Sequence, residues 1–323
     1  MQQKQRFDKL QLYVSEKIIG QSELVNRLIL AMLADGHLLV EGAPGLAKTR
    51  AIQVLSEAVE GDFHRVQFTP DLLPADITGT EIFQPQTGKF EFRKGPLFHN
   101  LVLADEINRA PAKVQSALLE AMAERQITVA GETYKLAEPF MVMATQNPIE
   151  QEGTYHLPEA QLDRFLMHVR VDYPNLEAEK QILHLNRAEA LDEIQHQVTA
   201  PEIHISKDDI REARKQVMQL YMAESVEEYL LQLVMATRQP EAYSQELASA
   251  IAFGASPRAT MALDRCARAH AWLQGRDYVG PDDVQSVAHD VLRHRVLLSF
   301  EGEASGKTSD QMIDTLLSLV AVP

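Results

Sequence analysis

The sequence predicts an α/β fold with a parallel sheet, followed by an all-α domain. Short apolar runs alternate with helical or loop segments up to Val171, which is the alternation that a parallel sheet with crossover helices requires. Two further segments alternate apolar and polar residues around a turn, as β-hairpins do. From Leu176 onward the pattern is helical, with Gly and Pro as punctuation. The predicted domains are therefore residues 1–175 and 176–323.

The first predicted elements lead into a loop rich in Gly and Pro. Residues 22–34 place their apolar side chains on one stripe at helical spacing, and Ser22 is available as a cap. The apolar run at residues 37–40 then turns abruptly into the loop, as a buried strand does when it enters a phosphate-binding loop. We expect a second helix to follow the loop and to end near residue 60.

Four later apolar runs predict further strands of the same sheet. These runs are residues 64–68, 101–104, 140–144 and 165–171. Between the second and third runs, residues 112–125 carry apolar side chains at the spacing of one helix face. The two alternating segments, 80–92 and 126–136, are the predicted hairpins.

Composition places the chain among folded, water-soluble proteins. Its 323 residues allow about two domains of ~150 residues each. No stretch approaches the ~18 unbroken apolar residues of a membrane span, and residues 1–20 lack the apolar core of an export signal. We therefore expect no membrane span and a cytoplasmic location. Cys266 is the only cysteine, which excludes an intramolecular disulfide and a cysteine metal cluster.

The charge balance is acidic. There are 46 acidic and 31 basic side chains, which give a formal net charge of −15, and no block of Lys or Arg interrupts this background. Non-specific binding of nucleic acid depends on clustered cations that release counterions. The composition therefore disfavours a nucleic-acid partner, although it leaves room for a small basic pore or loop.

A phosphate-binding loop is predicted between the first strand and the second helix. Its residues are Gly42, Ala43, Pro44, Gly45, Leu46, Ala47, Lys48 and Thr49. In a P-loop the backbone N–H groups wrap the β-phosphate, the lysine contacts the β- and γ-phosphates, and the hydroxyl takes one position on Mg²⁺. The sequence departs from the general pattern at Ala47, where glycine is usual. A chance Gly-rich turn between strand and helix is the alternative.

Two adjacent carboxylates end the apolar run at residues 101–104. Asp105 and Glu106 stand where ligands bind in open α/β sheets, outside the carboxyl ends of the strands. Asp105 would hold Mg²⁺ through its water shell, and Glu106 would orient and deprotonate the attacking water. The alternative is an acidic strand end that faces solvent. The P-loop upstream favours the catalytic interpretation, with ATP as substrate.

With these motifs in place, the chain resembles an AAA+ ATPase of the MoxR family, in the helix-2-insert branch that also contains magnesium chelatase ATPase subunits. The resemblance covers nearly the whole chain. Its landmarks are Ile19-Gly20-Gln21, GAPGLAKT at 42–49, LADEINRAP at 103–111, ATQNP at 144–148, PEAQLDRF at 158–165 and GASPR at 254–258. The two predicted hairpins fall where this branch carries its insertions.

The resemblance implies roles for residues outside the two motifs. Asn147 matches the sensor that helps to hold the lytic water, although an Asn before a Pro also forms turns. Arg164 matches the arginine finger that reaches the γ-phosphate of a neighbouring subunit; a surface pair with Asp163 is the plainer alternative. Arg258 matches the second sensor of the lid, and whether it acts on its own subunit or a neighbour stays open. Ile19 and Gly20 match the strip that borders adenine, although a plain helix entry is the alternative for them, and Arg50 is also assigned to the nucleotide site.

The resemblance also implies an assembly and partners. It implies a homo-oligomeric ring, expected to be a hexamer, that hydrolyses ATP with Mg²⁺ and remodels or matures protein clients, with metal insertion as one such role. A partner with a von Willebrand factor A domain is expected. Two rival functions remain: a nucleic-acid translocase of the same branch, against which the acidic balance counts, and a scaffold that only binds nucleotide, against which Glu106, Asn147 and Arg164 count.

Overall fold

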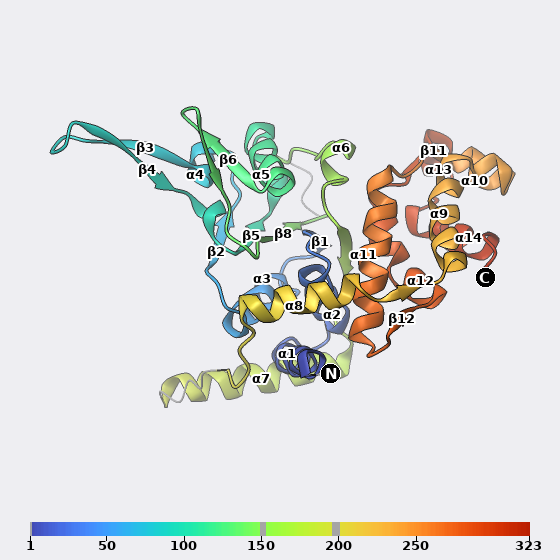
Figure 1. Ribbon diagram of the computed structural model, residues 1–323, viewed down its shortest axis with the longest axis horizontal. Helices are drawn as coiled ribbons and strands as arrows, with labels where there is room; N and C mark the ends of the chain where they lie inside the picture. Colours follow the sequence, from blue (N-terminus) through green and yellow to red (C-terminus); the bar gives the residue numbers. More distant parts are fainter. Residues whose placement is uncertain (1, 149–152, 196–200) are drawn as a thin grey trace. The chain divides into compact units, whose positions relative to one another are not determined.

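The computed structural model describes residues 2–148, 153–195 and 201–323. The chain divides into two compact units (Figure 1). Unit 1 contains Met1–His156 and Val169–Arg211, and unit 2 contains Leu157–His168 and Glu212–Pro323. This division differs from the predicted boundary at residue 175. Residues 157–168, which run into the sheet strand Met167–Val171, belong with the helical unit. The long helix Leu176–Ile194, which follows that strand, belongs with the sheet.

A five-stranded sheet forms the centre of unit 1. Its strands are β1 (Leu38–Gly42), β2 (Phe63–Gln67), β5 (Leu101–Asp105), β8 (Met141–Gln146) and β9 (Met167–Val171). They are arranged in the order β2-β5-β8-β1-β9. The pairs β2–β5, β5–β8 and β1–β8 are parallel, so the predicted parallel sheet is confirmed. The carboxyl ends of β2, β5, β8 and β1 therefore meet at one edge of the sheet.

Burial of the central strands follows from their composition. All five residues of β5 and the first five of β8 are buried, as expected for a strand with apolar side chains on both faces. At the edge of the sheet, β2 exposes His64, Arg65 and Gln67 while Val66 is buried. This leaves polar side chains of β2 directly beside the end of β5, because Gln67 is in register with Asp105.

Helices of unit 1 surround the sheet (Figure 1). They are α1 (Gln2–Lys17), α2 (Ser22–Leu33), α3 (Lys48–Ala58), α4 (Pro74–Thr78), α5 (Ala112–Glu124) and α7 (Leu176–Ile194), with 3-10 turns η1 (Pro96–Phe98) and η2 (Ile107–Arg109). Helix α8 (Lys207–Met218) continues into unit 2. Helix α1 was not predicted. Its fully or almost fully buried residues Phe7, Leu10, Val14 and the following Ile18 recur at helical spacing.

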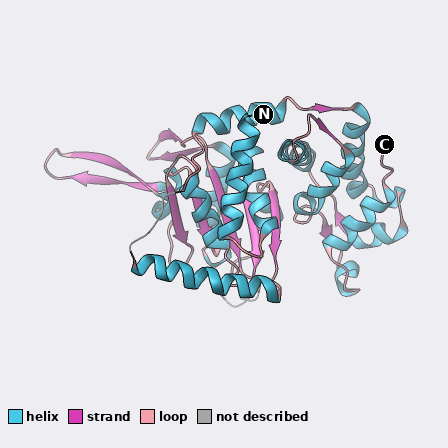
Figure 2. Cartoon of the chain, turned by 90° about the horizontal axis from the view of Figure 1, so that it is seen from below, coloured by secondary structure: helices cyan, strands magenta, loops and turns pink. Residues whose placement is uncertain are grey.

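Both predicted hairpins are confirmed. The first is formed by β3 (Gly79–Gln84) and β4 (Lys89–Lys94), and the second by β6 (Gln126–Val129) and β7 (Glu132–Lys135). Figure 2 shows β3 and β4 extending away from the rest of unit 1 as a long two-stranded arm. Phe83 and Phe90 are both exposed on this arm, with ring centroids 5.3 Å apart.

Unit 2 is mainly helical. Its helices are α6 (Glu159–Leu162), α9 (Glu224–Arg238), α10 (Gln245–Ala250), α11 (Pro257–Leu273), α12 (Pro281–Leu292), α13 (Phe300–Ala304) and α14 (Ser309–Leu319), with the 3-10 turn η3 (Pro240–Ala242). Two short strand pairs were not predicted: β10 (Tyr221–Met222) with β12 (Tyr278–Val279), and β11 (Ile251–Phe253) with β13 (Leu297–Leu298). Strands of two or three residues are too short to produce an alternation in the sequence. Cys266 is buried.

Candidate active site

The predicted phosphate-binding loop joins β1 to α3. Gly45 has φ 84° and Ala47 has φ 57°, so both adopt left-handed backbone conformations. This conformation costs a residue with a Cβ about 1–2 kcal/mol, which explains why glycine is usual at the position of Ala47. Gly42 is required for a different reason, because a Cβ there would lie 2.6 Å from the carbonyl oxygen of Val171. Lys48 and Thr49 open α3.

The Lys48 side chain is partly buried and contacts the ends of two sheet strands. Its Nζ donates to the carbonyl oxygens of Gly42 and, at 3.4 Å, Gln146. Burial lowers the pKa of Lys48, while the charges of Asp105, Glu106 and Glu41 partly oppose that shift. Both hydrogen-bond acceptors are neutral carbonyls. A phosphate that enters the loop would therefore gain a charge-assisted hydrogen bond.

Asp105 ends β5 with its side chain largely buried. Its Oδ1 accepts a hydrogen bond of 2.6 Å from Thr145 Oγ1. Its Oδ2 lies 3.4 Å from Thr49 Oγ1 and accepts from Arg65, at 2.7 Å from Nη2 and 3.1 Å from Nε. The carboxylate is thus oriented by the neighbouring strand β8 and neutralised by a cation from β2.

Glu106 follows with a left-handed φ of 56°. Its backbone N–H donates to Thr145 Oγ1 at 2.9 Å, so one threonine hydroxyl connects both acidic residues. The carboxylate oxygen Oε2 accepts from Gln67 Nε2 at 2.7 Å and from Arg109 Nη1 at 3.0 Å. A non-glycine residue held at positive φ is typical of functional sites, where the surrounding structure imposes the backbone strain.

These residues line a cavity of about 380 Å³ at the carboxyl edge of the sheet. Its lining consists of Pro44, Gly45, Leu46, Ala47, Lys48, Thr49, Arg50, Arg65, Gln67, Asp105, Glu106, Thr145 and Asn147. Asn147 is buried and follows directly after β8. The structure therefore brings together the predicted loop, the two carboxylates and the predicted sensor.

A second cavity of about 230 Å³ lies on the other side of the loop. It is lined by Ile19, by loop residues 44–47, by Arg50 and by residues of α7 that include Asn186. Gly20 lies between the lining residues Ile19 and Gln21 and packs closely against Pro174, since a Cβ at Gly20 would lie 2.9 Å from Pro174 Cβ. Arg50 forms an ion pair with Glu189 of α7. The residues predicted to border the base thus lie beside the loop that would hold the phosphates.

Two predicted site residues belong to unit 2. Arg164 lies just after α6, and Arg258 lies in the first turn of α11. Neither lines the cavities described in unit 1. Arg258 Nη1 lies 3.6 Å from Asp163 Oδ2, so Asp163, the partner that the plainer interpretation gives to Arg164, forms an ion pair with Arg258.

Three polar residues of the large cavity were not predicted from sequence. Arg65 and Gln67 come from β2, and Thr145 comes from β8. Residues i and i+2 of a strand share a face, so Arg65 and Gln67 could have been singled out as one polar face. What was missing was the strand order, which places β2 next to β5. Arg109, three residues after Glu106, is the ion-pair partner of the Glu106 carboxylate.

Thr49 and Asp105 fit the chemistry of Mg²⁺. They offer a hydroxyl and a carboxylate oxygen 3.4 Å apart, and Mg²⁺ prefers such hard oxygen donors. In nucleotide-binding sites Mg²⁺ is held by one or two side chains together with phosphates and water. The described part of the chain contains no group of three or more His, Cys, Asp or Glu residues that could form a metal cage by itself.

Two family models match the chain and define its class. The model described as "ATPase family associated with various cellular activities (AAA)" matches residues 37–167, and the AAA lid domain model matches residues 245–316. The first match spans the loop, the carboxylate pair and Asn147, and the second lies in unit 2. The fold and the site are those of an AAA ATPase with a helical lid.

Individual relatives narrow this class to one family. The chain is 44% identical to Chaperone MoxR1 of Mycobacterium tuberculosis, over 96% of this chain and 80% of that protein. It is 42% identical to the protein YeaC of Bacillus subtilis, over 96% and 93%. A solved structure from Cytophaga hutchinsonii has a TM-score of 0.91 at 44% identity and covers 99% of this chain and 96% of that one. The chain belongs to the MoxR family of AAA+ ATPases.

Proposed function

We propose that this ATPase hydrolyses ATP in the 380 Å³ cavity, as a ring of identical subunits, and uses the energy to remodel protein clients. One observation carries the catalytic part of the proposal. A phosphate-binding loop, two carboxylates and a buried amide from three different strand ends line the same cavity. Phosphoryl transfer needs mainly positioning and electrostatic stabilisation, and these groups can supply both.

Substrate binding would begin at the loop. The N–H groups at the start of α3 and the helix dipole favour an anion at this point. Lys48 would exchange its carbonyl acceptors for phosphate oxygens, with Asp105 and Glu106 helping to keep it protonated. Mg²⁺ bound through Thr49 and Asp105 would neutralise part of the phosphate charge. The base would occupy the second cavity beside Ile19 and Arg50.

Hydrolysis would require Glu106 as general base for the attacking water. Its Oε2 accepts hydrogen bonds from Gln67 and Arg109, so the other oxygen, Oε1, is the one that would accept a proton from water. Asn147 lies beside it in the cavity lining and would help to hold the water through its amide. Arg164 of a neighbouring subunit would stabilise the charge on the transferred phosphoryl group.

The assembly is tested by subunit mixing. Arg164→Ala should bind ATP but hydrolyse it slowly, because a finger supplied in trans contributes about 10³ to 10⁵ in rate. Mixed with Glu106→Gln it should recover activity, since some interfaces then combine an intact Glu106 with an intact Arg164. Absence of recovery in rings shown to be co-assembled, or full activity in a monomer, would contradict the ring mechanism. The mass of the assembly decides whether it is a hexamer.

The client part of the proposal rests on relatives and family resemblance. One relative is named a chaperone, and the family resemblance implies a partner with a von Willebrand factor A domain and a role in maturation or metal insertion. Purification of Glu106→Gln from the native host with ATP should retain such a partner, because blocked hydrolysis prolongs the ATP state. Recovery of nucleic acid alone would favour a translocase instead.

A further inference from the structure

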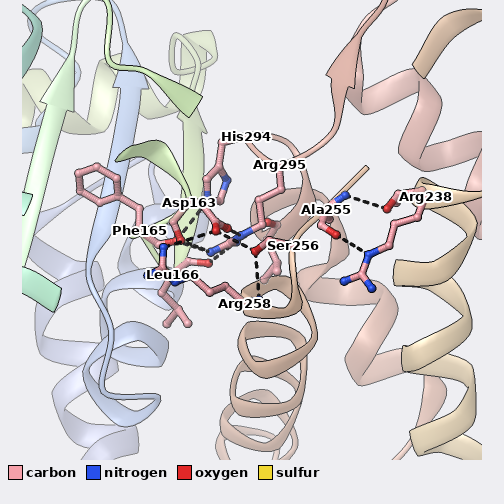
Figure 3. A network of polar contacts seen from close by, with 11 residues as sticks. Asp163, Phe165, Leu166, Arg238, Ala255, Ser256, Arg258, His294 and Arg295 are labelled. Atoms are coloured by element: carbon pink, nitrogen blue, oxygen red, sulfur yellow. Dashed lines mark hydrogen bonds and ion pairs between the residues drawn. The ribbon is translucent and has the colours of Figure 1, made fainter. Parts of the chain in front are cut away.

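A buried guanidinium in unit 2 holds the segment that carries Arg164 (Figure 3). Arg295 follows α12, and only 2% of its side chain is exposed. Its Nη2 donates to the carbonyl oxygens of Phe165 at 2.6 Å and Asp163 at 3.2 Å, and its Nη1 donates to that of Leu166 at 3.1 Å. One side chain therefore binds the backbone on both sides of Arg164.

The same guanidinium also pairs with the Asp163 carboxylate. Arg295 Nε lies 2.7 Å from Oδ1. The other oxygen, Oδ2, accepts from Ser256 Oγ at 2.8 Å and lies 3.6 Å from Arg258 Nη1. Ser256 caps α11, since its Oγ accepts from the backbone N–H of Arg258 at 3.1 Å. Asp163 is thus shared between Arg295 and the start of the helix that carries Arg258.

A buried arginine is better suited to positioning a backbone segment than to stabilising the fold. Its donors form a rigid planar fork, so carbonyl acceptors on either side of one residue are held in a fixed arrangement. Burial lowers the pKa of Arg295, and the hydrogen bond and charge of Asp163 oppose this. Because desolvation offsets much of the attraction in a buried ion pair, such a pair is weak evidence for a gain in stability. The geometry of the Arg295 contacts therefore says more about their role than any gain in stability does.

We propose that Arg295 is a positioning residue for Arg164. Arg295 fixes the carbonyls of Asp163, Phe165 and Leu166 and thereby orients the backbone that carries Arg164. Through the shared carboxylate of Asp163, this positioning is connected to Arg258. The proposal rests on the proposed function, because it requires Arg164 to act on a neighbouring subunit. It assigns Arg295 no contact with nucleotide.

Arg295→Lys tests the proposal, because lysine keeps the charge but lacks the planar fork. The variant should bind a fluorescent ATP analogue within about two-fold of wild type while its kcat falls at least ten-fold. Arg268→Lys is the matched control. Arg268 is also a mostly buried arginine of unit 2, and it pairs with Asp264 at 2.8 Å and with the Leu220 carbonyl, outside the Arg164 segment. The control should keep kcat within about two-fold of wild type.

Subunit mixing separates positioning from a general loss of structure. Arg295→Lys mixed with Glu106→Gln should regain activity, because intact Glu106 subunits then face neighbours with intact Arg295 and Arg164. Arg295→Lys mixed with Arg164→Ala should not, since both defects affect the subunit that supplies the finger. Recovery in this second mixture, or none in the first while Arg164→Ala with Glu106→Gln recovers, would overturn the proposal.

Two further outcomes are informative. If Arg164→Ala alone hydrolyses ATP at the wild-type rate, the trans finger of the proposed function fails and this proposal fails with it. If Arg295→Lys does not assemble, Asp163→Asn is measured in the same two mixtures, because it removes the carboxylate charge that holds the Arg295 guanidinium in register with the three carbonyls. The same pattern of recovery is expected, and the opposite pattern overturns the proposal.

Discussion

The guanidinium of Arg65 lies on the carboxylate of Asp105, with Nη2 2.7 Å and Nε 3.1 Å from Oδ2. The same oxygen faces Thr49 Oγ1 at 3.4 Å, and these two oxygens are the proposed Mg²⁺ ligands. A Mg²⁺ ion held at Asp105, through its water shell or directly, would be repelled by the charge of this guanidinium. We therefore expect Arg65 to compete with Mg²⁺ for Asp105.

Removal of this competitor should lower the requirement for Mg²⁺. In Arg65→Gln, the Mg²⁺ concentration that half-saturates nucleotide binding should fall several-fold relative to wild type, measured by titration at a fixed concentration of a fluorescent ATP analogue. Arg93→Gln, on the exposed face of β4, is the control and should leave the titration unchanged. An unchanged or increased Mg²⁺ requirement in Arg65→Gln would show that Arg65 does not compete with the metal.

The P-loop lysine should dominate nucleotide affinity. Lys48→Ala should weaken ATP binding by about 10- to 100-fold, because hydrogen bonds to charged groups contribute about 1.5–3 kcal/mol. Direct titration with a fluorescent nucleotide measures this change. Lys113→Ala, at an exposed position of α5, should bind like wild type. Equal affinity in Lys48→Ala and wild type would mean that the loop does not hold phosphate.

Local motifs made the catalytic edge predictable from sequence. The loop at 42–49 and the pair Asp105 and Glu106 each combine an apolar strand with the polar residues that follow it, so both the element and its ligand-binding end can be inferred from adjacent residues. The hairpins were predictable for the same reason, because alternation and turn residues are local signals.

Features that depend on strand order or distant packing were not predictable. Arg65 contacts Asp105 only because β2 pairs with β5. Arg295 holds a segment about 130 residues earlier in the chain, and nothing in the residues around 295 indicates this contact. The division of the chain into units has a similar cause, since residues 157–168 belong with the helices of unit 2 although they run into strand β9 of the sheet.

Acid should destabilise unit 2 through His294. Burial lowers the pKa of His294 well below 6.5, the charges of Arg295, His168 and Arg293 lower it further, and the hydrogen bond to the Phe165 carbonyl opposes the shift. The folded state therefore binds fewer protons than the unfolded state between the folded pKa and 6.5. The free energy of unfolding consequently falls as the pH decreases through this window.

His294→Gln should reduce that pH dependence, because its amide can still donate to the Phe165 carbonyl but cannot bind a proton near neutral pH. The loss of stability from this group is about 1.4 kcal/mol per pH unit below 6.5, which corresponds to a few degrees in Tm. The fall in Tm between pH 7.5 and 5.5 should be smaller in His294→Gln than in wild type. His289→Gln, partly exposed beside Asp314, is the control; an equal fall in all three proteins would contradict the explanation.

We propose the cavity at the end of β5 as the hydrolytic site, with Glu106 as its base. The most direct measurement compares nucleotide binding and ATP hydrolysis in the same preparation of Glu106→Gln. We expect binding within about two-fold of wild type and hydrolysis reduced by about 10² or more, because the amide cannot accept the proton of the attacking water. Hydrolysis near the wild-type rate, with binding intact, would show that another group activates the water.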